Sequence, residues 1–303
     1  SEYRRSVLMV EAEPGRCYLV DVFRVRGGSQ HDWIVHGGHA DFSANFELPA
    51  PRQEGTLAGP EVPYGHYYDN AAMAAVPYGS ANYAGYRGSG FQFLYGVREA
   101  ALAPGACGRW DFIGAGPRAS ALSKPTAGAF LKAHLIGDDE RLFVCQGKPQ
   151  QNRKDSPESV AFLVRRRAGE ALESTFVTVF EPGAGDELIR SVTRLPTDRA
   201  DLVALRLELR SGAIHDVFCG VEAPSAPVVV DGVTFAGQVG HLVRSAAGTV
   251  ESAYLYNATR LAFGDWQCEG LGPWQSHIAA CDYRARTVRL ADPLPRDRSL
   301  AGL

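Results

Sequence analysis

Side chains that can transfer protons or bind a cation are concentrated in residues 31–41, whose sequence is HDWIVHGGHAD. The ordinary pKa of histidine lies close to neutral pH, so His31 and His36 are candidates for a general acid or base. Imidazole nitrogens and carboxylate oxygens also bind divalent metals such as zinc. His36, His39 and Asp41 are the candidate ligands for such a metal. The alternative is that these three are solvated polar residues of a turn.

Two residues of this segment, His31 and Asp32, also have a structural explanation. A histidine next to a carboxylate can form a hydrogen-bonded pair that fixes the corner where the chain turns at glycines 27 and 28. Asp32 and His36 share one face of the expected strand, but they lie about 13 Å apart along it, which is too far to share an ion directly. The two glycines that follow His36 allow close approach of a ligand or of another backbone segment.

The element that must position this segment is a strand expected over residues 16–26. Alternation places Asp21 and Phe23 on one face of that strand and Val20 and Val22 on the other. Both faces are largely apolar, so we expect the strand to lie inside a packed sheet. A buried carboxylate at Asp21 then needs a partner, because an unpaired buried charge is strongly destabilising.

Residues 42–90 form a long segment that is rich in glycine, proline, alanine and tyrosine and has no clean periodicity. Long loops without secondary structure of their own are uncommon in compact domains and are often functional. Tyr64, Tyr67 and Tyr68, grouped around His66, offer aromatic faces that can bind the apolar side of a sugar ring. The alternative is that the loop packs its own aromatic side chains over an open sheet face.

Cations gather in a second segment, between residues 148 and 167. Arg165, Arg166 and Arg167 are consecutive, and Lys148 and Arg153 are close to them in sequence. Their charge is suited to contact with an acidic glycan. The alternative is a solvated strand end, because alternation directs every second residue of a strand outward.

Turn signals divide the rest of the chain into short strands. Pro14-Gly15 and Asp231-Gly232 each separate two apolar segments, which is typical of a hairpin. Residues 241–244 and 252–256 are expected to pair with each other. Further antiparallel strands are expected on either side of turns at 137–140 and 168–169, and no long amphipathic helix is visible.

This succession predicts an all-β protein with the architecture of a large antiparallel β-sandwich. We expect a first sheet region over residues 1–125, which includes the 42–90 loop, and a second over residues 126–303. The two regions are expected to form one continuous body.

The composition of the 303-residue chain excludes several classes of function. A formal net charge of −3 and a pI near 6.2 argue against nucleic acid as the main partner, because there is no basic excess to neutralise phosphates. No apolar run approaches the length of a membrane span. The six cysteines include no CxxC pair, so neither a zinc ribbon nor a redox motif is expected.

Two stretches of the sequence carry a resemblance to a known family. Residues 16–37, RCYLVDVFRVRGGSQHDWIVHG, and residues 164–169, VRRRAG, followed by 174–182, STFVTVFEP, resemble the C-terminal β region of the heparinase II/III-like polysaccharide lyases. In that family an (α/α) toroid precedes a large antiparallel β-sandwich, and the active site lies in the cleft between them. The resemblance implies β-elimination on uronic-acid polysaccharides such as heparan sulfate or alginate, by a bacterial protein that is secreted or periplasmic.

The sequence also departs from the family pattern. The toroid with its Asn, His and Tyr catalytic groups is absent, and so is the HxHxD segment that can hold a metal; the nearest match is HGGHAD at 36–41. We therefore expect this chain to be the β-sandwich portion of a lyase and to form one wall of its substrate cleft. Its partners would be an acidic polysaccharide and a helical toroid from the same polypeptide.

β-Elimination needs a neutralised carboxylate, a base for the proton on C5 and an acid for the leaving oxygen. The candidates by residue type are His36, His31 and Tyr67 for catalysis. The candidates for substrate binding are Tyr64, His66, Tyr68 and Arg153. Two alternatives stay open: a non-catalytic carbohydrate-binding or scaffold sandwich, and a β domain associated with a hydrolase.

Overall fold

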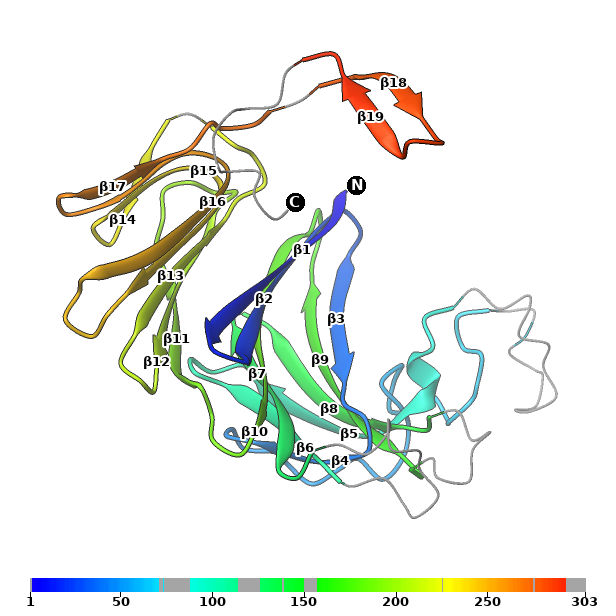
Figure 1. Ribbon diagram of the computed structural model, residues 1–303. Helices are drawn as coiled ribbons and strands as arrows, with labels where there is room; N and C mark the ends of the chain where they lie inside the picture. The colour runs from blue at the N-terminus through cyan, green and yellow to red at the C-terminus, as the bar shows by residue number, and fades with distance from the viewer. Residues whose placement is uncertain are drawn as a thin grey trace. The chain divides into compact units, whose positions relative to one another are not determined.

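The computed structural model describes residues 2–70, 73, 88–113, 126–137, 139–149, 157–224, 226–274 and 276–292. Across these ranges the protein is all-β, as predicted, and antiparallel sheets pack against one another (Figure 1). The helical element described is a 3-10 turn, η2 (Phe91–Phe93). No helix in the described ranges is long and apolar enough to cross a membrane. Contacts divide the chain into two compact units, Ser1–Val192 (unit 1) and Thr193–Leu303 (unit 2).

Unit 1 contains two antiparallel sheets. The six-stranded sheet has the order β1 (Glu2–Glu13), β2 (Arg16–Arg26), β10 (Glu173–Ala184), β7 (Ala129–Ile136), β6 (Cys107–Phe112) and β4 (Ala40–Ala44). The four-stranded sheet has the order β3 (Gln30–His36), β9 (Val160–Ala168), β8 (Arg141–Gly147) and β5 (Leu94–Ala101). The boundary expected near residue 125 falls between β6 and β7, which pair with each other in the first of these sheets.

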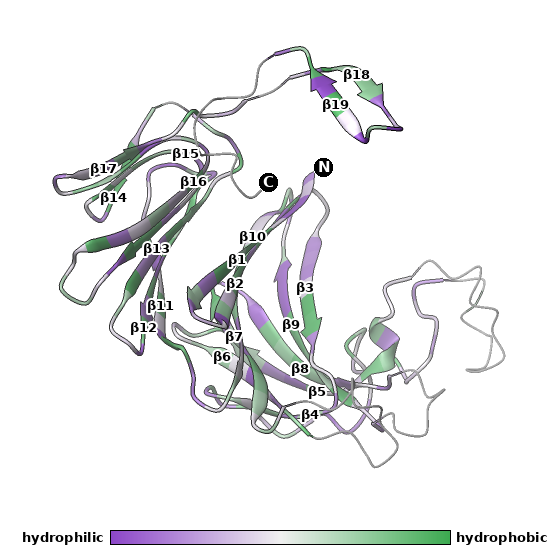
Figure 2. Ribbon diagram, in the orientation of Figure 1, coloured by the Kyte–Doolittle hydropathy of each residue, from purple (hydrophilic) through white to green (hydrophobic). Residues whose placement is uncertain are grey.

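The core of unit 1 lies between the inner faces of these two sheets. Phe23 and Phe176 come from the six-stranded sheet, and Trp33 and Leu163 come from the four-stranded sheet. Trp110 is fully buried among them, and its indole N–H donates a hydrogen bond of 3.0 Å to a β9 carbonyl. Hydrophobic stretches run along the strands of both sheets (Figure 2). Apolar burial between the sheets therefore forms a sandwich within unit 1.

Several of the predicted turns connect strands that do not pair with each other. The chain passes from one sheet to the other between β2 and β3, between β7 and β8, and between β9 and β10. These corners explain why turn signals at 27–28, 137–140 and 168–169 are not hairpins, although Pro14-Gly15 does join the paired strands β1 and β2. Pairing is set by long-range contacts: β2 lies between β1 and β10, which are far apart in sequence.

A buried arginine links the two sheets. Arg165 on β9 is fully buried, and all five of its N–H groups donate hydrogen bonds. Nε and one Nη2 hydrogen bind the Glu140 carboxylate at 2.6 and 3.1 Å. The other three bind the Val177 carbonyl, the Thr178 hydroxyl and the Ile136 carbonyl at 2.7, 2.9 and 2.9 Å. The expectation that Arg165 belongs to a solvated strand end or contacts a glycan is therefore wrong.

The electrostatics of this site follow from its burial. Desolvation lowers the pKa of Arg165, and the Glu140 charge and hydrogen bonds act in the opposite direction. Gly137 is required next to the pair, because a Cβ there would lie 2.6 Å from Glu140 Oε1 and 2.7 Å from Arg165 Nη2. A buried ion pair of this kind is stable only while both partners and their hydrogen bonds are present.

A second polar link between the sheets involves Asp21. Its carboxylate accepts hydrogen bonds of 2.7 and 2.8 Å from Arg5 on β1 and one of 3.0 Å from the Trp33 indole on β3. Asp21 thus has the partners that its burial requires. The hydrogen bonds from Arg5 raise the pKa of that arginine.

Unit 2 is built on one antiparallel sheet and a separate hairpin. The sheet has the order β11 (Ile189–Leu195), β12 (Val203–Leu209), β13 (Ile214–Cys219), β15 (Val233–Arg244), β16 (Val250–Phe263) and β17 (Trp266–Glu269), and β14 (Val228–Val230) also pairs with β15. The hairpin consists of β18 (Ile278–Asp282) and β19 (Thr287–Leu290). The predicted pairing of 241–244 with 252–256 is confirmed by the β15–β16 register. The Asp231-Gly232 hairpin is confirmed too, and both residues have positive φ.

Unit 2 has its own core and its own buried charges. Phe218 and Phe235 stack at 4.9 Å within a cluster that includes Leu242 and Leu261. Asp216 is fully buried and accepts hydrogen bonds of 2.7 Å from Arg206 and 2.5 Å from Arg244. On the opposite face of the sheet, His241 Nε2 lies 3.2 Å from His215 Nδ1. All six cysteines of the chain are free thiols.

The first prediction concerns the arginine that links the sheets. Replacement of Arg165 by Met is expected to lower the free energy of unfolding by about 3–5 kcal/mol, because it leaves the buried Glu140 carboxylate with the longer 3.3 Å ion pair to Arg167 and removes the donor from three further buried acceptors. Urea unfolding measures this. The control is Arg141→Met, which removes an exposed ion pair to Glu99 and is expected to cost about 1 kcal/mol or less. Equal costs for the two variants would contradict the role assigned to Arg165.

The second prediction concerns pH. Burial, with a smaller contribution from the neighbouring His215, lowers the pKa of His241 from 6.5 to about 4. Between these values the unfolded chain binds a proton that the folded chain does not, so stability should fall as the pH drops from about 6.5 towards 4, by an amount on the order of 3 kcal/mol. The variant His241→Gln should show a shallower fall over this interval. Identical pH profiles of unfolding in the two proteins would contradict this assignment.

Candidate functional site

The first half of the tyrosine-rich segment packs on the outer face of the four-stranded sheet, which we call the loop face. Leu57 belongs to one buried cluster with Phe143, Cys145 and Val164, which project from β8 and β9 on the side opposite the core. Backbone hydrogen bonds fix the segment along β5. The Leu57 N–H donates to the Leu94 carbonyl at 2.8 Å, and the Arg52 N–H donates to the Val97 carbonyl at 2.9 Å. The loop is therefore an ordered layer over this face.

A pocket of about 720 Å³ lies between this loop and the end of β8. Its volume is in the range of ordinary small-molecule sites. It is lined by Gln53, Glu54, Gly55, Pro60, Glu61, Pro63, Tyr64, Tyr95 and Lys148. We call it the tyrosine pocket.

The wall of the tyrosine pocket combines aromatic rings with charges. Tyr64 makes edge-to-face contacts with Phe93 at 5.7 Å and with Tyr95 at 5.6 Å between ring centroids. Lys148 Nζ lies 5.0 Å from the centroid of the Tyr64 ring, in a cation–π contact. Glu54 and Glu61 add carboxylates to the lining. The pocket thus offers apolar ring surface, hydrogen-bond acceptors and one cation within the reach of a single small ligand.

A smaller hollow of about 270 Å³ adjoins the same lysine. Phe91, Phe93 and Phe162 line it, together with Ile34, Gly147 and Lys148. Glycine is required at 147, because a Cβ there would lie 2.4 Å from the Phe162 ring. Lys148 therefore belongs to both cavities and marks where they meet.

His36 lies beside the smaller hollow and is exposed. Its ring packs on Phe162 at 4.6 Å between centroids. Its Nδ1 is 2.7 Å from the Gly37 carbonyl, which can only accept, so the neutral ring carries its proton on Nδ1 and has a lone pair on Nε2. An exposed Nε2 with a lone pair can accept a proton from a ligand.

His31 is committed to a structural role. Its side chain is buried; Nδ1 lies 2.8 Å from the Ser174 hydroxyl and Nε2 lies 2.5 Å from the Gly27 carbonyl. The expected pair of His31 and Asp32 does not form. Asp32 instead accepts hydrogen bonds of 2.6 Å from Arg166 and 2.7 Å from Gln30. The reason is alternation, which directs these neighbouring side chains to opposite faces of β3.

The three tyrosines that were expected to bind a sugar ring, Tyr64, Tyr67 and Tyr68, have different environments. Tyr64 lines the tyrosine pocket, and Tyr67 is fully buried, with its ring packed edge-on against Phe93. Tyr68 is 37% exposed, and its hydroxyl lies 3.0 Å from that of Ser89. His66, which lies between Tyr64 and Tyr67 in the sequence, is partly buried. The structure thus places Tyr64 at a cavity and gives Tyr67 a packing role.

The other predicted residues are not gathered at a site. His39 and Asp41 are exposed, at the start of β4 at the edge of the six-stranded sheet, whereas His36 ends β3 in the other sheet. Among the described residues no three His, Cys, Asp or Glu side chains are arranged to hold a metal ion, so the candidate ligands His36, His39 and Asp41 do not form a metal site. Arg153 lies outside the described residues.

Sequence reasoning missed Glu54, Glu61, Phe93 and Tyr95 as parts of the site. For Tyr95 a signal existed, because it lies at the start of β5, the strand that follows the loop. For the two glutamates no local pattern distinguishes them from any solvated loop carboxylate. They become site residues only because the loop folds back along β5.

The chain matches no protein-family model, and no curated protein matches it.

The third prediction separates the two histidines of β3. His31→Ala is expected to lower the free energy of unfolding by about 1–3 kcal/mol, because it leaves the buried Ser174 hydroxyl and the Gly27 carbonyl without their partner. His36→Ala removes an exposed ring and is expected to cost about 0.5 kcal/mol or less. Chemical denaturation of the two variants measures this difference. A His36 variant as unstable as the His31 variant would contradict the environments described.

Proposed function

We propose that this chain is the β-sandwich portion of a polysaccharide lyase similar to the heparinase II/III family, and that its loop face is a glycan-binding wall of the substrate cleft. The observation that carries the proposal is the tyrosine pocket, with Tyr64 and Tyr95 beside Lys148. The resemblance of residues 16–37 and 164–182 to the family supplies the class of reaction, β-elimination on a uronic-acid glycan. On the same grounds the protein is proposed to be periplasmic or secreted.

The composition of the pocket is suited to a sugar that carries one negative charge. Aromatic faces pack against the C–H side of a pyranose ring. The Lys148 ammonium can pair with the carboxylate of a uronate, while Glu54 and Glu61 can accept hydrogen bonds from sugar hydroxyls. Each role uses a residue that already lines the cavity.

The elimination step would need more than this chain offers at the loop face. His36 has an exposed Nε2 that can serve as the base for the C5 proton. His31 and Tyr67 are buried in the fold, so neither can reach a glycan on the loop face. We propose that the leaving-group acid comes from a helical portion of the same polypeptide.

A second candidate function is a carbohydrate-binding sandwich without catalysis. The burial of His31 and Tyr67 favours it, because two of the three candidate catalytic side chains serve packing. Both candidates share the tyrosine pocket as the glycan site. They differ in whether elimination takes place there.

The fourth prediction tests the pocket. Tyr64→Ala is expected to weaken binding of a uronate oligosaccharide by about three- to tenfold, because it removes a ring face from the cavity wall. Isothermal titration calorimetry measures the dissociation constant. The matched control is Tyr254→Ala, which removes an equally large ring, 57% exposed, on β16 of unit 2. Equal effects of the two substitutions, or no binding by the unmodified chain, would contradict the proposal.

The same oligosaccharide distinguishes the two candidates. The lyase proposal expects that a polypeptide joining this chain to a helical toroid produces unsaturated uronide, which is detected by its ultraviolet absorbance. In that polypeptide, His36→Ala is expected to abolish the product while glycan binding is retained. A joined polypeptide that binds the glycan and yields no product would favour the binding module instead.

A further inference from the structure

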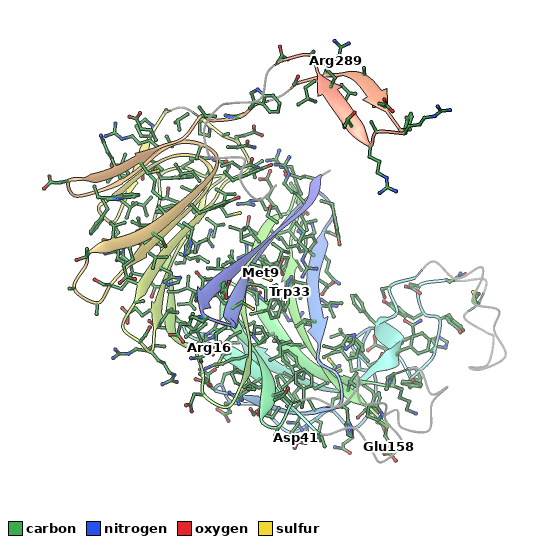
Figure 3. The ribbon with its side chains drawn as sticks, viewed as in Figure 1. Met9, Arg16, Trp33, Asp41, Glu158 and Arg289 are labelled. Atoms are coloured by element: carbon green, nitrogen blue, oxygen red, sulfur yellow. The ribbon has the colours of Figure 1, made fainter. Side chains whose placement is uncertain are left out.

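The strand β1 is a long, exposed edge of unit 1. In the described part of the chain it pairs with β2 alone. Tyr3, Val7 and Met9 project from its inner face and are 82%, 55% and 75% exposed; Figure 3 labels Met9 on this strand. An edge with unpaired backbone groups and exposed apolar side chains is a template for pairing with another strand.

The sequence of this edge is complementary to itself. Arg5 lies near its start and Glu11 near its end, with the apolar residues between them. Arg5, Val7, Met9 and Glu11 all project to the same face, because they are separated by even numbers of residues. If two copies of β1 run antiparallel, each arginine can therefore meet a glutamate.

One register satisfies all of these side chains. When Leu8 faces Leu8 of the second copy, Arg5 faces Glu11 and Val7 faces Met9, each twice by symmetry. If the twofold axis lies at Val7 instead, Arg5 faces Met9 of the second copy. If it lies at Met9, Val7 faces Glu11. Oppositely charged and apolar cross-strand pairs are stabilising, so the Leu8-centred register is favoured.

The geometry of Arg5 supports this pairing. Its Nε and Nη2 donate to Asp21 of the neighbouring strand β2 at 2.7 and 2.8 Å, which holds the guanidinium in one orientation, and its side chain is still half exposed. Glu11 uses one carboxylate oxygen to accept from Gly15 N at 3.1 Å. The Arg5 Nη1 group and the second Glu11 oxygen can then meet across the edge. A guanidinium held by a buried carboxylate loses little freedom on pairing.

We infer that a second copy of this chain docks on β1, strand to strand and antiparallel, with the twofold axis at Leu8. The two six-stranded sheets then join into one continuous sheet. Charges on an edge strand commonly prevent such pairing. Here, however, the signs are opposite at the two ends, and an antiparallel copy converts them into attraction.

Cysteine cross-linking tests the register. In the dimer the two Cα atoms at position 8 lie about 4.5–5.5 Å apart, within disulfide range, whereas those at position 6 lie about 13 Å apart. Leu8→Cys is expected to give a covalent dimer on mild oxidation, with peptide mapping that joins position 8 to position 8. Ser6→Cys is the matched control and is expected to stay uncross-linked through its new thiol. Equal cross-linking of both, or of neither, would overturn the inference.

Charge reversal tests the interface without new thiols. Glu11→Arg places two arginines face to face at each end and is expected to raise the dimer dissociation constant by about tenfold or more, as measured by light scattering over a concentration series. Glu208→Arg makes the same charge change on an exposed residue of β12 and should leave the constant unchanged. A monomeric unmodified chain at high concentration, or equal effects of the two variants, would contradict the proposal. Neither outcome bears on glycan binding at the loop face.

Discussion

The ion pair between Arg165 and Glu140 is the constraint on which the arrangement of unit 1 depends. Its guanidinium binds β9 to groups of β7 and β10 and to the connection before β8, so it fixes the two sheets of the sandwich to each other. A charge placed there without five acceptors would be strongly destabilising. Those acceptors come from separate segments, so the pair forms only when both sheets are correctly packed.

This constraint determines where chemistry can occur. The core between the two sheets is occupied by Arg165, by the Asp21 group with Arg5 and Trp33, and by large apolar side chains. His31 is fixed at the corner that enters β3. Polar side chains that remain accessible in the four-stranded sheet, such as His36, lie on the loop face. There the tyrosine-rich segment adds the walls of a cavity.

Local patterns in the sequence predicted the elements well. Alternation identified β2 and β3, and turn residues identified the β1–β2 and β14–β15 hairpins, because both signals depend on neighbouring residues alone. Sheet changes at the corners could not be predicted in this way. A corner and a hairpin use similar turn residues, and the choice between them is made by partners far away in sequence, such as β10 for β2.

The site was predicted only in part, for the same reason. Tyr64 and His36 stood out by type and context, and both lie at or beside a cavity. Arg165 looked like its neighbours in a run of three arginines, and nothing local showed that it would be buried. Glu54 and Glu61 have site positions because the loop hydrogen-bonds along β5, a long-range contact with no sequence signature.

The central claim is that the loop face of unit 1 binds a glycan while the interior of the sandwich serves structure alone. A crystal structure of the chain soaked with a uronate oligosaccharide tests it most directly. The account predicts sugar density against the rings of Tyr64 and Tyr95, with a carboxylate next to Lys148. Ordered sugar elsewhere on the molecule, with that pocket empty, would contradict it.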